Sequence, residues 1–166
     1  MVPPLEPPDL HFATAAAGWL ELGLFDETRA ELERLSPEGR RHPDVLAVEW
    51  EWCAREGRWN DALETASRLL EVDVDRPVGW INRSYALHEL RRTDEAREAL
   101  LPALPRFPTL GVIPYNLACY ACQLGQMEEA RGWLRQAIAR DGRDVVLERA
   151  REDADLAPLR DELEGI

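Results

Sequence analysis

The chain has 166 residues, of which 45% are hydrophobic and 31% charged, a composition typical of a globular protein with a proper core. Its formal net charge is −12, all 20 basic residues are arginine, and the acidic excess lies towards both ends. An acidic surface repels phosphate backbones, which disfavours nucleic-acid binding and favours a neutral or basic partner, although solubility alone explains the charge equally well.

The sequence contains no apolar run of the ~18 residues that a membrane span needs. The first ten residues, MVPPLEPPDL, lack the basic residue and apolar stretch of a secretory signal. Three cysteines, an odd number, favour reduced thiols over a disulfide framework. We therefore expect a cytoplasmic protein with no membrane partner.

The first segment, residues 1–8, contains four prolines and is expected to form an extended arm. One hypothesis left open is that this arm folds back and imitates a bound ligand.

From Asp9 the sequence repeats with a period of 34 residues, which divides it into blocks 9–42, 43–76, 77–110 and 111–144. Two columns carry the repeat. Small residues recur in one of them, at Thr28, Ala62, Ala96 and Ala130. Turn residues recur in the other, at Gly23, Gly57, Arg91 and Gly125. Each block is expected to form a helix, a short turn and a second helix, because apolar residues within it recur at helical spacing.

Several residues interrupt this pattern. SPEGRRHP predicts that the second helix of the first block stops near Leu35, and Pro102 and Pro105 should shorten the second helix of the third block. Three tryptophans near Cys53 indicate altered packing in the second block; they are Trp50, Trp52 and Trp59. The last segment, 145–166, is expected to form a helix, a break near Asp155 and a short final helix that caps the repeats.

The 34-residue period and its two columns resemble the tetratricopeptide repeat (TPR). The resemblance covers about residues 9–144 and implies an all-α fold, a right-handed α-solenoid of helix–turn–helix units. It also implies a concave groove, lined by the first helix of each repeat, in which another protein or peptide binds. The groove residues expected from this resemblance are Ala13, Ala17, Val48, Glu51, Asn82, Tyr85, His88, Glu89, Tyr115, Asn116, Cys119 and Gln123.

Asn82 and Asn116 occupy equivalent positions, 34 residues apart. An asparagine amide can donate to and accept from a peptide backbone at once, and the nearby Tyr85 and Tyr115 offer flat apolar anchors. Alternatively, these asparagines bond a neighbouring helix, as is common in the family.

The pair Cys119 and Cys122 forms a CxxC, but the repeat places it in the middle of a helix, where packing is the more frequent role. The three histidines are far apart, and no motif assembles a nucleophile, a base and an orienting group. The sequence therefore predicts no metal, no cofactor and no enzymatic activity.

The predicted function is that of an adaptor or scaffold that binds a protein segment. The groove lacks the lysines with which chaperone-binding TPR domains clamp a carboxylate. Two alternatives stay open: a self-associating homo-oligomer, in which the tryptophan-rich block mediates contact, and a holder of a client segment similar to bacterial secretion chaperones.

Overall fold

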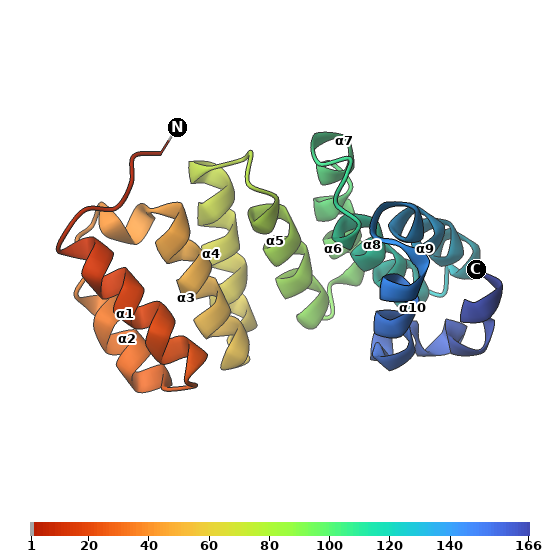
Figure 1. Ribbon diagram of the computed structural model, residues 1–166, viewed down its shortest axis with the longest axis horizontal. Coiled ribbons are helices and arrows are strands. Elements are labelled where there is room, and N and C mark those ends of the chain that lie inside the picture. The colour runs from red at the N-terminus through yellow and green to blue at the C-terminus, as the bar shows by residue number, and fades with distance from the viewer. Residues whose placement is uncertain (1) are drawn as a thin grey trace. The chain divides into compact units, whose positions relative to one another are not determined.

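The computed structural model describes residues 2–166, and almost all of the chain from Asp9 onward is helical (Figure 1). Residues 2–166 contain no β-strand, so the prediction of an all-α fold is confirmed. The α-helices in chain order are α1 (Asp9–Glu21), α2 (Phe25–Glu33), α3 (Pro43–Arg55), α4 (Trp59–Val72), α5 (Pro77–Glu89), α6 (Thr93–Leu100), α7 (Ala103–Arg106), α8 (Val112–Gln123), α9 (Met127–Asp141) and α10 (Arg143–Glu152). Two 3-10 helices complete the fold, η1 (Gly39–Arg41) and η2 (Ala154–Gly165).

The turn column marks the ends of the first helices. Gly23, Gly57, Arg91 and Gly125 all have positive φ angles, of 73, 68, 62 and 75° respectively. The next residue's N–H donates to a carbonyl five residues back, as from Leu24 to Trp19 at 2.9 Å and from Gln126 to Ala121 at 2.8 Å. This is the Schellman termination, which needs a left-handed residue at that position and therefore favours glycine. The repeated turn in the sequence is thus a repeated helix stop.

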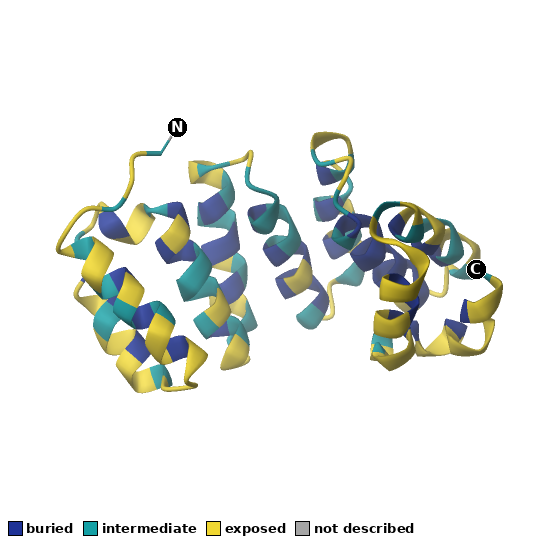
Figure 2. Cartoon of the chain, viewed as in Figure 1, coloured by how far each residue is buried: buried dark blue, intermediate teal, exposed yellow. Residues whose placement is uncertain are grey.

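The small-residue column lies where second helices pack on first helices. Thr28, Ala62, Ala96 and Ala130 are all fully buried. Helix α1 packs on α2, α3 on α4 and α8 on α9, and a small side chain lets the two helices of a pair approach closely. Buried residues therefore form stripes along the helices, with exposed residues on the opposite faces (Figure 2).

The expected interruptions occur. Helix α2 ends at Glu33, and the second helix of the third block is divided into α6 and α7 around Pro102. The tail breaks at Asp153, close to the expected Asp155, and differs in one detail: its last segment is a 3-10 helix. The break falls there because the Asp153 carboxylate accepts the N–H of Asp155 at 3.0 Å, which caps η2.

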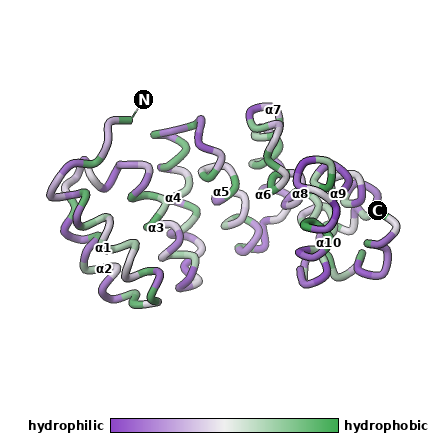
Figure 3. The backbone as a smooth tube through the Cα atoms, in the orientation of Figure 1, coloured by the Kyte–Doolittle hydropathy of each residue, from purple (hydrophilic) through white to green (hydrophobic). Residues whose placement is uncertain are grey.

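The chain forms two compact units, residues up to Ala86 and Leu87–Ile166, and the boundary falls within α5. In the first unit, Ala13, Ala16, Leu32, Leu35 and Val45 form one core cluster. A second cluster contains Cys53, Ala62 and Ala86, with the tryptophans of α3 and α4 packed around it. In the second unit the largest fully buried side chains come from α6, α8, α9 and η2. Figure 3 shows both hydrophobic and hydrophilic stretches along the tube of this unit.

The N-terminal arm lies beside η1. Leu5 packs against the first core cluster, and the His42 ring nitrogen Nε2 is 3.0 Å from the carbonyl oxygen of Pro3. That the arm imitates a ligand stays a prediction.

Candidate protein-binding face

In the first unit, the expected groove residues differ widely in exposure. Asn82 and Ala13 are buried, Ala17 and Val48 are half-buried, and Glu51 and Tyr85 are exposed. The accessible part of this face therefore consists mainly of a carboxylate and an aromatic ring.

Tyr85 has an aromatic support. Its ring meets Trp59 edge-on with centroids 5.8 Å apart, and Trp50 in the same manner at 6.3 Å. The side chain is nevertheless 39% exposed. Edge-to-face packing holds the ring in one orientation without covering it, so Tyr85 presents a preformed apolar surface.

Glu51 is held by the neighbouring turn of α3. Arg55 donates to the Glu51 carboxylate at 2.6 Å and to the carbonyl of Leu20 at 2.8 Å. The same guanidinium thus caps the end of α1 and orients an exposed carboxylate.

In the second unit, most of the expected groove residues are covered. His88, Tyr115, Asn116 and Cys119 are buried, with exposed fractions of 6, 2, 7 and 5%. Glu89 is half-buried and Gln123 is exposed. Ligand contact by the four buried residues would require the segments packed on them to move.

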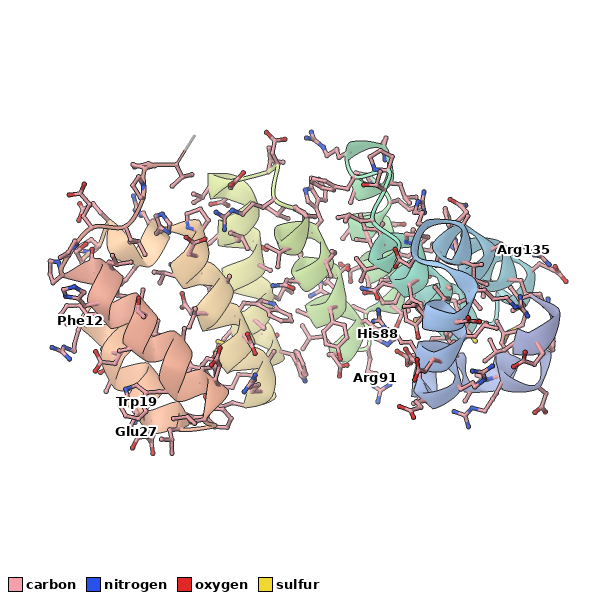
Figure 4. The ribbon with its side chains drawn as sticks, viewed as in Figure 1. Phe12, Trp19, Glu27, His88, Arg91 and Arg135 are labelled. Atoms are coloured by element: carbon pink, nitrogen blue, oxygen red, sulfur yellow. The ribbon has the colours of Figure 1, made fainter. Side chains whose placement is uncertain are left out.

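The C-terminal segment provides these covering contacts. Asp153 accepts from the Tyr115 hydroxyl at 2.9 Å and lies 3.7 Å from the sulfur of Cys119. The Asp155 carboxylate is 3.0 Å from Nε2 of His88, and its backbone carbonyl accepts from Gln123 at 2.9 Å. The guanidinium of Arg149 stacks 3.9 Å from the centre of the Tyr115 ring. These contacts fix the turn between α10 and η2 against α8 and the end of α5, where Figure 4 labels His88.

These covering contacts were not predicted from the sequence, although the sequence contains a signal for them. Arg149 follows Tyr115 by one period of 34 residues, and Asp153 follows Cys119 by the same step. Helix α10 therefore continues the register of the first helices, and its side chains contact their equivalents one repeat earlier.

The thiol groups of the cysteines are unreactive. All three are free and buried. Burial, opposed by Arg58, raises the pKa of Cys53 to about 11, and burial together with Asp153 and Asp155 raises the pKa of Cys119 well above its usual value. A raised pKa keeps the thiol protonated and unreactive. The CxxC lies within α8, as predicted, and Cys122 contacts the sulfur of Met127 at 4.0 Å.

One cluster has metal-binding atoms. The sulfur of Cys119 and one carboxylate oxygen each from Asp153 and Asp155 all lie within 4.8 Å of one another.

Solved structures of very different sequence share this fold. TTC0263, a thermophilic TPR protein of Thermus thermophilus, superimposes with a TM-score of 0.69 at 19% identity, with 95% of each chain covered. The chain has the tetratricopeptide-repeat fold. A MamA structure from Desulfovibrio magneticus RS-1 gives a TM-score of 0.76 at 13% identity, over 98% of this chain and 90% of that one. The expected TPR solenoid is therefore confirmed at the level of the fold.

Sequence comparison agrees over part of the chain. The TPR repeat-containing protein MJ1428 of Methanocaldococcus jannaschii is 30% identical over 82 residues, which is 49% of this chain. The chain spans only 14% of that relative's length. No family model matches this chain.

Among residues 2–166, none of the helices has the length and apolar character needed to cross a membrane.

Proposed function

We propose that this TPR chain is a non-enzymatic adaptor that binds a segment of another protein through the first helices of its first unit. TPR folds generally serve protein interaction. The observation that favours this unit is the exposure of Tyr85. Its equivalent one repeat later, Cys119, is 5% exposed and covered by the C-terminal segment. An oriented and partly exposed aromatic ring is the kind of residue that anchors interfaces.

The charge of this unit suggests the partner's chemistry. Acidic residues outnumber arginines by about two to one in the first 86 residues. The exposed Glu51 lies one repeat before Tyr85, at the equivalent position. A segment with an apolar side chain close to a basic one would place the first on Tyr85 and the second near Glu51. Asn82 is 7% exposed, so we assign it to packing between helices rather than to direct contact with the partner.

The test compares three baits in an extract of the source organism: the wild type, the double variant Tyr85→Ala/Glu51→Gln, and the control Val72→Ala. Val72 is 40% exposed but lies at the end of a second helix, α4. A partner retained by the wild type and the control should be lost from the double variant. Calorimetry with the partner's segment as a synthetic peptide should then show at least about tenfold weaker binding, or about 1.4 kcal/mol.

Equal recovery of the partner by all three baits would exclude this face. A folded circular dichroism spectrum of the double variant at the temperature of the experiment is the control for folding, because loss of the Tyr85 contacts with Trp50 and Trp59 should lower the melting temperature.

A homo-oligomer is the second candidate, favoured by exposed apolar residues at one end of the α1–α2 hairpin. Leu22 is 70% exposed in the turn between α1 and α2, and Leu24 is 39% exposed. Trp19, labelled in Figure 4, is 37% exposed. Trp52 and Trp59, which the sequence suggested for this role, are half-buried against the core. Light scattering after gel filtration should show a mass that rises with concentration and falls in Leu22→Asp. A constant monomer mass would reject this candidate.

A further inference from the structure

Four side chains with metal-binding atoms converge where the turn between α10 and η2 meets α8. The donor set is the Cys119 thiol, the carboxylates of Asp153 and Asp155, and the His88 imidazole, which is 3.0 Å from Asp155. The donors come from three separate segments of the chain. The thiol and the imidazole are 5% and 6% exposed, whereas the two carboxylates are half-buried, so the cluster reaches from the interior to the surface.

The negative charge of the cluster is offset only in part, by the nearby Arg149. Among the described residues, Asp153 forms no ion pair with an arginine, and the ion pair of Asp155 is with His88. Arg149, on α10 beside the cluster, stacks on the Tyr115 ring instead. Partly buried carboxylates are costly unless a cation or several hydrogen bonds compensate them. Hydrogen bonds from Tyr115, Cys119 and the N–H of Asp155 already compensate Asp153 in part, and a cation held between the two aspartates would add to them.

We propose that Cys119, Asp153 and Asp155 bind a zinc ion. Zinc bonds of about 2.3 Å to sulfur and about 2.0 Å to oxygen set the donor atoms of a tetrahedral site about 3.3–3.5 Å apart. The sulfur of Cys119 is already 3.7 Å from an Asp153 oxygen, and all three donors lie within 4.8 Å. The donor atoms approach one another by up to about 1.5 Å to close the site, a solvent molecule takes the fourth position, and the thiol proton passes to solvent.

The surroundings have the arrangement that metal ligands require. Tyr115 donates to Asp153 at 2.9 Å, and His88 contacts Asp155, so each carboxylate is oriented by a neighbouring side chain. Such contacts hold ligands in place in known metal sites. A thiolate among the ligands favours zinc over magnesium or calcium, which prefer oxygen donors alone. This proposal departs from the expectation, drawn from the sequence, that the CxxC holds no metal.

The bound ion would join α8 to the C-terminal segment. Because Asp153 and Asp155 flank the start of η2, coordination fixes the end of α10 on the fourth repeat. Zinc should therefore raise the melting temperature of the second unit, since a ligand that binds only the folded state stabilises it.

The experiment uses the full chain, freed of metal with a chelator and dialysed against Zn²⁺ or Co²⁺. We expect one ion per chain and, with cobalt, the charge-transfer absorption of a thiolate ligand. Cys119→Ser should lose this absorption and bind zinc at least about tenfold more weakly. The matched control is Cys122→Ser, a buried thiol three residues along the same helix, which should retain both properties.

If Cys119→Ser does not fold, as judged by circular dichroism without metal, Asp155→Asn is the test variant in its place. It should also weaken zinc binding, while its cobalt complex keeps the thiolate band. Three results would overturn the proposal: no zinc retained by the folded wild type, a thiolate band that survives Cys119→Ser, or a band lost in Cys122→Ser.

Discussion

Arg91 occupies the position that glycine takes in the other three turns. Its φ angle is 62°, in the left-handed region that costs an L-residue about 1 kcal/mol. We expect Arg91→Gly to stabilise the chain by about 0.5 kcal/mol, because the relief of strain exceeds the added flexibility of the unfolded state. Urea denaturation, with the midpoint compared at equal slope, would measure this difference.

Gly57→Ala is the reciprocal control. A Cβ added at Gly57 meets nothing within 4 Å, so the whole cost would arise from the φ angle of 68°. This variant should lose about 1 kcal/mol. If Arg91→Gly destabilises the chain, the arginine side chain, which Figure 4 labels at the end of α5, contributes more than its backbone strain costs.

At the scale of elements, Asp9 joins the start of α1 to the end of α2. Its carboxylate accepts from the backbone N–H of Ser36 at 2.9 Å and from the Ser36 hydroxyl, which in turn accepts the N–H of Gly39 at 3.0 Å. The hydroxyl bond, and secondly the backbone bond, lowers the pKa of Asp9. A carboxyl whose pKa is lowered by folding stabilises the protein above its unfolded-state pKa of about 3.9, and this stabilisation is lost as the pH falls through the folded value.

Asp9→Asn should therefore lower the melting temperature at neutral pH and lose less stability than the wild type as the pH falls below about 4. Thermal unfolding followed by circular dichroism across this range measures both effects. Ser36→Ala should reduce the stabilisation that Asp9 provides. The effects of Ser36→Ala and Asp9→Asn on the free energy of unfolding should therefore not be additive. Additive effects would mean that the hydroxyl bond contributes nothing.

The sequence predicts the helices and turns of this fold because their causes are local. A left-handed residue at Gly23 or Gly125 ends a helix wherever it occurs, and Pro102 interrupts one for reasons within its own peptide. The candidate site was less predictable. Tyr115 and Cys119 have the spacing of groove residues. Their exposure, however, depends on where the C-terminal segment that contains Arg149, Asp153 and Asp155 packs. Only the 34-residue steps from Tyr115 to Arg149 and from Cys119 to Asp153 indicate these contacts.

At the scale of the whole molecule, the chain consists of two compact units, and in repeat folds each element gains stability mainly from its neighbours. Leu159 in η2 and Leu46 in α3 are both fully buried, one in each unit. Each Leu→Ala substitution removes buried contacts and leaves a cavity, at a cost of about 2–5 kcal/mol. The two variants should therefore damage different parts of the chain.

Hydrogen exchange followed by mass spectrometry would locate this damage. Leu159→Ala should reduce amide protection in α8, α9 and α10, which lie in the same unit as η2, and leave α1 and α2 protected. Leu46→Ala should show the reverse. A uniform loss of protection in both variants would mean that the chain opens only as one cooperative body. In that case an ion bound at the turn between α10 and η2 would raise amide protection in α1 as strongly as in α8. If the two units open separately, the effect of the ion is confined to the second unit.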